Sequence, residues 1–215
     1  MFKSLFSRHK PEPDKYAGTP AIMGLKLGGS FELDALALKL VMADMVVSQV
    51  APTQIIQSAG IVDLDDTTIY RFYTDDEGFL QVVANGEGEE NVVDVKMFHY
   101  YDTLDVANQS EWDRLLKQEI GANTYQLEGH TYHRVWTSTT DYHNPVHMEE
   151  KTYQDNMDFS STDQFTMLFE RELPSGEMES LFLSAEEVLN NNALERCLVI
   201  STGMTISPTQ ITIHG

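Results

Sequence analysis

The chain has 215 residues and a formal net charge of −20 at pH 7, with 34 Asp and Glu against 14 Lys and Arg. So acidic a protein repels phosphate backbones, and we therefore expect no binding to DNA or RNA. The hydrophobic fraction of 41% is enough for a folded core, and a single cysteine excludes an internal disulfide.

The beginning of the chain differs in charge and composition from the remainder. Residues 1–15 carry a net positive charge, and three prolines within residues 1–20 disfavour regular structure. Three apolar side chains would share one face of a short helical turn: Phe2, Leu5 and Phe6. We therefore expect a flexible tail over 1–20 that binds a protein partner or, through residues 1–10, contacts a membrane surface peripherally. A frayed terminus is the alternative.

Residues 21–215 are expected to form a single acidic domain. No stretch approaches the roughly 18 apolar residues of a membrane span, and the start of the chain lacks the apolar run of a secretory signal, so we expect a cytoplasmic protein. The strand-like segments after Gly60 and Gly129 resemble each other faintly. They suggest two related β-rich halves with a boundary near 105–123, although aromatic residues gather in any strand.

The first part of this domain is predicted to form one helix and then strands. Apolar residues recur at helical spacing after Asp34, which is a suitable cap, and this pattern predicts a helix over 34–43. β-Branched and aromatic residues then dominate successive segments, which predicts strands over 55–64, 67–73, 79–83 and 93–101. The acidic turn at 74–78 would join two of them as a hairpin.

A second helix and a second hairpin are predicted next. Ser110 and Asp113 form a capping box at the start of an apolar stripe, which predicts a helix over 111–120. A hairpin follows over 125–136. The segment 137–156 is a polar stretch of tyrosines and histidines with no predicted element.

The last part of the chain is predicted to be mostly strand. Alternating apolar residues flank a Pro-Ser-Gly turn at 174–176, which predicts another hairpin. A capping box at 184–187 predicts a short helix ending at 190–192, and strands follow at 196–203 and 209–213. Together the elements predict an α+β fold with a predominantly antiparallel β-sheet and two or three short helices.

Signatures of catalysis are missing from the sequence. No phosphate-binding loop, nucleophile elbow or kinase signature occurs. In a calcium loop starting at Asp63, Thr68 would stand where a glycine is needed. Cys197 lies in an apolar run and is expected to be buried and inert. We therefore expect a protein that binds rather than catalyses and that needs no cofactor, with enzymatic activity as the alternative.

The histidines are the only chemical cluster in the sequence. Imidazoles and a carboxylate that could hold zinc or another divalent metal lie close together in the chain: His130, His133, His143, His147 and Glu149. However, His130 and His133 would face opposite sides of a strand. Pro145 prevents a helix that would stack the later pair. A metal site is therefore an alternative to ordinary surface histidines.

Two arginines lie inside aromatic strands of a chain that has few basic residues. Arg71 and Arg134 are expected to pair with carboxylates and to stack on aromatic rings. Alternatively, they would form a ligand groove together with Tyr73 and Trp136. A third possibility is that the acidic body itself binds a cationic ligand such as a polyamine.

The order of several segments resembles a known family. The segments are MFKSLF (1–6), LGG (27–29), GIVDL (60–64), YRFYTDD (70–76), FLQ (79–81), YHRVW (132–136) and MLFER (167–171). Together they resemble the YjfK-like family of uncharacterised bacterial cytoplasmic proteins, over nearly the whole chain. The resemblance implies no catalytic residues, because the family has no established activity. Its members are often encoded near a membrane-associated protein similar to phage shock protein A, which implies a stress-related or membrane-adjacent accessory role.

The leading hypothesis from the sequence is therefore an accessory protein that binds a protein partner and has no enzymatic activity. The basic tail would supply a docking peptide, and the acidic body would bind the partner.

Overall fold

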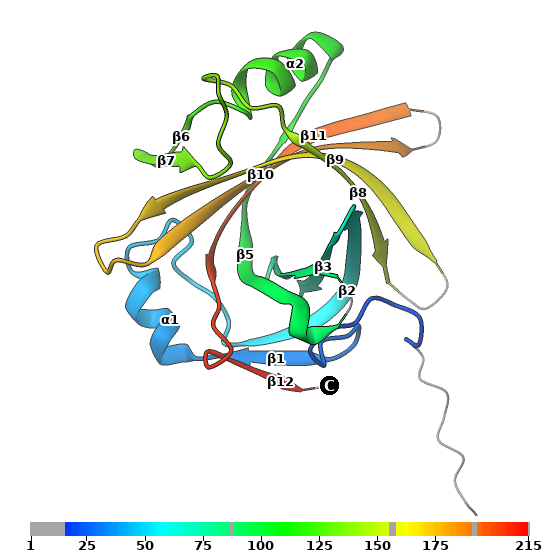
Figure 1. Ribbon diagram of the computed structural model, residues 1–215, viewed down its shortest axis with the longest axis vertical. Helices are drawn as coiled ribbons and strands as arrows, with labels where there is room; N and C mark the ends of the chain where they lie inside the picture. The colour runs from blue at the N-terminus through cyan, green and yellow to red at the C-terminus, as the bar shows by residue number, and fades with distance from the viewer. Residues whose placement is uncertain (1–15, 87, 155–157, 191–192, 215) are drawn as a thin grey trace, which may run out of the picture.

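The computed structural model describes residues 16–86, 88–154, 158–190 and 193–214. These residues form one antiparallel sheet in the order β12-β1-β2-β3-β4-β5-β11-β10-β9-β7-β6, with β8 pairing both β2 and β9 (Figure 1). The strands are β1 (Ser30–Leu33), β2 (Thr53–Leu64), β3 (Thr67–Thr74), β4 (Gly78–Asn85), β5 (Val92–Asp105), β6 (Thr124–Leu127), β7 (His130–Arg134), β8 (Val146–Tyr153), β9 (Phe159–Glu172), β10 (Met178–Asn190), β11 (Ala193–Thr205) and β12 (Ile211–His214).

The sheet closes on itself through β8. One edge of this strand pairs with β2 between Val62 and Ala59, and the other edge pairs along most of β9. The closed circuit is therefore an eight-stranded barrel made of β2, β3, β4, β5, β11, β10, β9 and β8. The expected α+β class is wrong, because the described residues are mostly strand and the helices only flank the barrel.

Helices occupy two short segments beside the barrel. Helix α1 (Ala35–Met42) confirms the prediction over 34–43, and Asp34 Oδ1 accepts hydrogen bonds from the amides of Leu36 and Ala37 at 2.9 and 3.1 Å. Helix α2 (Gln109–Arg114) continues into a π-helical turn over Leu115–Glu119. It begins earlier than predicted, because Asn108 rather than Ser110 is its cap.

The helix predicted from 184 to 190 is wrong, since this segment continues strand β10. Every residue from 179 to 185 is buried and pairs with β11, as in a strand whose two faces are both covered. The capping-box pattern is local, and the sheet contacts on both sides of the strand override it. The polar stretch 137–156 likewise contains a strand that was not predicted, β8.

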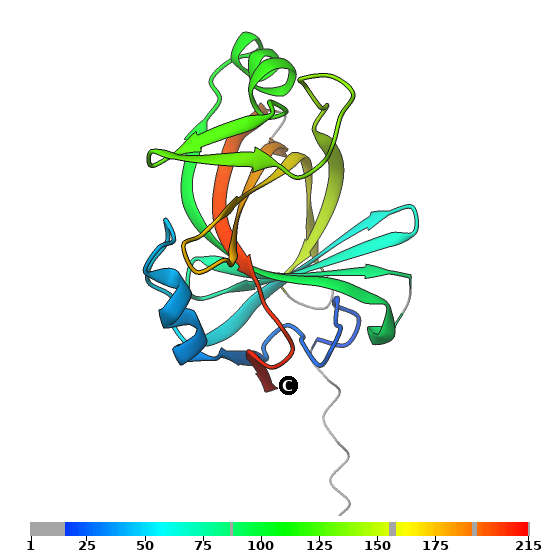
Figure 2. The ribbon, with the colours of Figure 1, turned by 60° about the vertical axis from the view of Figure 1, so that its left-hand side comes forward.

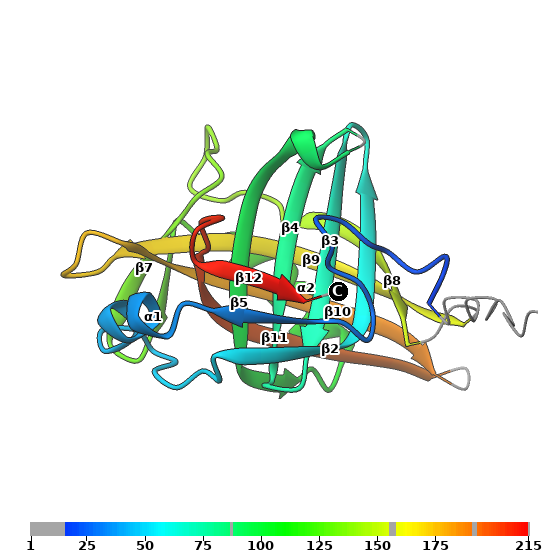
Figure 3. The same cartoon turned by 90° about the horizontal axis from the view of Figure 1, so that it is seen from below.

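Apolar layers cover the outside of the barrel on two sides. Strands β1 and β12 and helix α1 pack against the outer face of β2–β5, and Figure 3 shows β1 and β12 crossing beneath these strands. On the other side, α2 and the β6–β7 hairpin cover β9–β11, as Figure 2 shows. A 3-10 turn at Glu89–Asn91 precedes β5. The apolar core therefore lies largely outside the barrel wall. Every second residue of each barrel strand points the other way, into the barrel interior.

Neither helical segment in the described part of the chain has the length and apolar character needed to span a bilayer.

Candidate functional site inside the barrel

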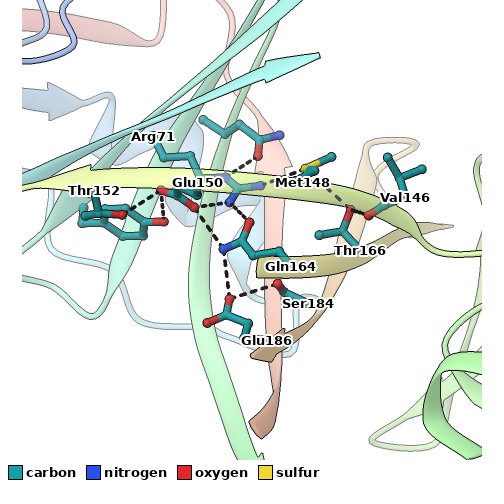
Figure 4. A network of polar contacts seen from close by, with 11 residues as sticks. Arg71, Val146, Met148, Glu150, Thr152, Gln164, Thr166, Ser184 and Glu186 are labelled. Atoms are coloured by element: carbon teal, nitrogen blue, oxygen red, sulfur yellow. Dashed lines mark hydrogen bonds and ion pairs between the residues drawn. The ribbon is translucent and has the colours of Figure 1, made fainter. Parts of the chain in front are cut away.

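The barrel interior is divided into three compartments along its axis. Strand β8 shows this division, because its alternate residues Val146, Met148, Glu150 and Thr152 all lie along the inside (Figure 4). The first two line an apolar cavity, Glu150 belongs to a buried polar network, and Thr152 lines a polar cavity. We call these compartments the apolar cup, the plug and the acidic cup.

The plug is centred on Arg71, whose side chain is 1% exposed. Its Nη1 donates to Glu150 Oε2 at 2.5 Å and to Gln164 Oε1 at 2.6 Å, and its Nε donates to Gln81 Oε1 at 3.0 Å. The guanidinium carbon lies 5.7 Å and 5.2 Å from the ring centres of Phe79 and Phe182. The expectation that Arg71 pairs with a carboxylate and stacks on rings is confirmed.

Charge neutralisation keeps this buried arginine ionised. Burial alone would lower the pKa of Arg71, but the nearby charge of Glu150 raises it overall. Gln164 extends the network, because its amide donates to Glu150 Oε2 at 3.0 Å. The plug is thus a satisfied ion pair that separates the two cups.

Gly60 on β2 makes room for the plug. A Cβ atom at this position would lie 1.8 Å from Glu150 Oε1, which is far inside van der Waals contact. The glycine therefore allows the Glu150 carboxylate to approach the backbone of the strand that pairs with its own.

The acidic cup is a cavity of about 300 Å³ at one end of the barrel. Its lining comes from six barrel strands, namely β3, β5 and β8–β11: Tyr73, Tyr100, Thr103, Glu150, Thr152, Thr162, Gln164, Glu186 and Val199. Two carboxylates lie here, but only Glu150 has a cationic partner, since no ion pair joins Glu186 to any residue that the structure describes. Burial raises the pKa of Glu186, and the charge of Glu150 raises it further.

The apolar cup is a cavity of about 400 Å³ at the opposite end. It is lined mainly by apolar side chains, with three polar ones among them: Leu64, Thr67, Ile69, Gln81, Val83, Asp94, Trp136, Val146, Met148, Leu168 and Phe182. Several of the apolar side chains are only half-buried, and three of these, Leu64, Val83 and Val146, pack against a small buried cluster that includes Ile69 and Met148. Burial raises the pKa of Asp94, which the charge of Lys96 opposes and that of Glu170 reinforces.

The structure separates the four residues of the predicted ligand groove. Arg71 is in the plug, Tyr73 lines the acidic cup and Trp136 lines the apolar cup. Arg134 donates instead to the carbonyl oxygens of Trp136 and Gly121, at 2.8 and 2.5 Å, so its expected pairing with a carboxylate is wrong. These two hydrogen bonds hold the segment that carries Trp136 in place, because the loop between β7 and β8 is not itself a strand of the sheet.

The predicted metal ligands are not gathered into one site. His147 Nε2 lies 2.7 Å from Asp163, His143 Nδ1 lies 2.6 Å from the carbonyl of Asn144, and Glu149 accepts a hydrogen bond from Ser161. His130 and His133 lie on β7 and are exposed. No group of three His, Cys, Asp or Glu side chains within the described ranges is arranged to hold a metal ion.

The remaining sequence-derived residues fall outside this site. Phe2, Leu5 and Phe6 lie outside the described residues. Cys197 is half-buried on β11, and burial together with the charge of Glu186 raises the pKa of its thiol to about 11. The thiol is therefore protonated at neutral pH, which agrees with the expected lack of reactivity.

Sequence reasoning missed Glu150, Gln164 and Glu186 as site residues. A signal was present in β8, where Met148, Glu150 and Thr152 occupy every second position. Because these residues are mostly polar, the alternation did not resemble the apolar–polar pattern of a half-buried strand.

Comparison with known proteins gives a family but no activity. A family model described as "Protein of unknown function (DUF2491)" matches residues 1–212. The chain is similar to the "Uncharacterized protein YjfK" of Escherichia coli (strain K12), with 27% identity over 89% of this chain and 87% of the relative. The resemblance to YjfK-like proteins is thereby confirmed. No solved structure matches the chain.

Proposed function

Given that the chain belongs to the DUF2491 family of proteins of unknown function, we propose that its barrel is a binding module for a small apolar molecule, which occupies the apolar cup. The observation that carries the proposal is a cavity of about 400 Å³ that is lined mainly by apolar side chains and closed at its inner end by a charged plug. This volume lies in the range of about 300–1,000 Å³ that is usual for ligand cavities.

The construction of the barrel supports this function. Eight strands enclose an interior that is either filled by side chains or wide enough for one small ligand. Here Ile69, Met148 and Phe182 form the buried part of the cup, and its outer part includes half-buried Leu64, Val146 and Trp136. A ligand would remove these outer side chains from water, which would contribute about 25 cal/mol for each Å² of apolar surface buried.

Val83→Phe tests this assignment, because Val83 is half-buried in the cup and a larger ring would occupy part of its volume. We expect the uncharged fluorescent dye N-phenyl-1-naphthylamine to bind the full chain with increased emission, and Val83→Phe to weaken that binding about tenfold. The matched control is Val93→Phe, since Val93 is 59% exposed and does not line the cup.

Three results would contradict the proposal. The first is failure of the dye to bind the full chain. The second is equal binding of the dye by Val83→Phe and Val93→Phe. The third is binding only after removal of residues 1–15, which would assign the cup to the chain's own N-terminal segment. Circular dichroism and urea unfolding of each variant establish that it is folded under the assay conditions.

A second candidate function is favoured by the acidic cup, namely binding of an organic cation such as a polyamine. Glu186 lacks an ionic partner among the described residues, and the rings of Tyr73 and Tyr100 line the same cavity. An ammonium group would neutralise this carboxylate and could rest on the aromatic faces. The acidic charge of the chain would also increase the rate at which cations arrive.

Spermidine titrated by calorimetry tests the second function. We expect Glu186→Gln to weaken binding about tenfold, whereas Glu177→Gln, the same change in charge on an exposed turn, should leave it nearly unchanged. Binding requires the Glu186 carboxylate, whose pKa is raised above its usual value. Affinity should therefore fall as the pH drops through that raised pKa, starting above pH 4.5. Equal binding by both variants would exclude the acidic cup.

A further inference from the structure

The inner wall of the apolar cup contains an unusual hydrogen-bonding arrangement. Arg71 Nη2 donates to the sulfur of Met148 at 3.7 Å (Figure 4). The hydroxyl of Thr166 lies 3.7 Å from the same sulfur and 3.3 Å from the carbonyl oxygen of Val146, so these two acceptors compete for its one hydrogen. A thioether is a weak acceptor. One donor of a charged and 1% exposed guanidinium therefore points to an atom that satisfies it only weakly, and a hydroxyl that could serve the same acceptor lies beside it.

The other donors of Arg71 have strong partners. Nε and Nη1 donate to oxygen atoms of Gln81, Glu150 and Gln164 at 2.5–3.0 Å. Nη2 alone has only the sulfur among the residues that the structure describes. Because an ionised donor forms hydrogen bonds about twice as strong as a neutral one, this unused capacity offers a specific interaction to a ligand acceptor at the inner end of the cup.

We infer that the ligand of the apolar cup is an uncharged apolar molecule with a carbonyl oxygen, which replaces the Met148 sulfur as the acceptor for Arg71 and Thr166. This inference rests on the function proposed above. Met148 and Phe182 line the cup, and the guanidinium lies directly behind them. Methionine has flexible torsions, so its side chain yields to a ligand more readily than a branched one.

Charges at the plug disfavour ionised head groups at the inner end of the cup. Arg71 is already neutralised by Glu150, so the negative charge of a ligand carboxylate at the plug would have no cation to compensate it. An ammonium at the same place would meet two donors and no free acceptor. Nearer the outside, Asp94 adds a carboxylate to the lining, which further disfavours anions. A neutral carbonyl supplies an acceptor without bringing a charge.

A matched series of compounds tests the inference by displacement of N-phenyl-1-naphthylamine. The series is 4-phenyl-2-butanone, butylbenzene, 3-phenylpropanoate and 3-phenylpropylammonium, which have nearly the same shape and differ in the end group. The quantity to compare is the ratio of ketone affinity to butylbenzene affinity in each protein variant, because differences in transfer from water cancel between variants.

Two variants should change this ratio in opposite directions. Thr166→Val removes one donor, so the ratio should fall about two- to tenfold. Met148→Leu keeps the volume but removes the competing sulfur, so the ratio should rise by a similar factor. The carboxylate and the ammonium should bind the native protein more weakly than the ketone.

The outcomes separate this inference from the proposed function. If no compound displaces the dye and the dye does not bind, the proposed function fails. If the compounds displace the dye but both variants keep the native ratio within about twofold, the cup binds apolar molecules and the assignment of the carbonyl to Arg71 and Thr166 is overturned. Tighter binding of the carboxylate than of the ketone would also overturn it.

Discussion

Arg71→Met should lower the free energy of unfolding by about 3–5 kcal/mol, which is the usual result of removing one partner of a buried ion pair. Methionine fills much of the space of the arginine stem, so the loss comes mainly from Glu150, whose carboxylate is 1% exposed and would be left without its cation. Gln81 and Gln164 would lose a donor as well. Urea unfolding followed by circular dichroism measures the change.

The control for this prediction removes both charges together. In Arg71→Met/Glu150→Met no buried charge remains unpaired, so the double variant should be more stable than Arg71→Met alone, although Tyr73 loses its acceptor. A loss of less than about 1 kcal/mol in Arg71→Met would mean that the pair contributes no more than an exposed salt bridge. In that case water must reach the plug.

Gly60→Ala should lower the free energy of unfolding by about 2–3 kcal/mol, because the added methyl group has no space. The new Cβ would lie 1.8 Å from Glu150 Oε1, so the carboxylate must shift, which disturbs its hydrogen bonds with Tyr73 and Arg71. Urea unfolding followed by circular dichroism measures the change.

Gly129→Ala is the comparison for the second prediction. Its Cβ would meet no atom within 4 Å, but the backbone φ of +77° is unfavourable for alanine, so we expect a loss of about 1 kcal/mol. Gly60 has no such backbone restriction, and its cost is steric. If Gly60→Ala unfolds at the same urea concentration as the native protein, the close approach of Glu150 to β2 does not persist in solution.

The elements that could be predicted from sequence are those with one apolar face. Strands β3 and β4 were predicted from β-branched and aromatic residues, and α1 from its periodicity and from Asp34. Their outward side chains pack in an apolar layer, so the pattern in the sequence is strong. The β9–β10 hairpin was found for the same reason.

The α+β class failed because of two segments whose local pattern misrepresents their contacts. The inner side of strand β8 changes from apolar Val146 and Met148 to polar Glu150 and Thr152, so no continuous apolar alternation marks the strand. The second half of β10 carries a capping box that the pairing with β11 overrides. Without β8 there is no closed barrel, and therefore no interior to predict.

The candidate site was only partly accessible from sequence. Arg71 was conspicuous because a basic residue inside an aromatic strand needs a partner. Its partner Glu150 lies 79 residues away, and nothing local to either residue indicates the pairing. The division into cups depends on which inward-pointing residues of different strands lie at the same height along the barrel axis. That can be known only from the register between the strands.

The position of β8 in the chain has a consequence for how the protein folds. Strands β2 to β5 form a meander of neighbouring pairs, whereas the seam between β2 and β8 joins residues about 90 positions apart. Contacts of such long sequence separation form slowly, so closure of the barrel is a late event on the folding pathway. Until then β2 and β8 each present an open strand edge, and the newly made chain depends on this seam to escape association with other chains.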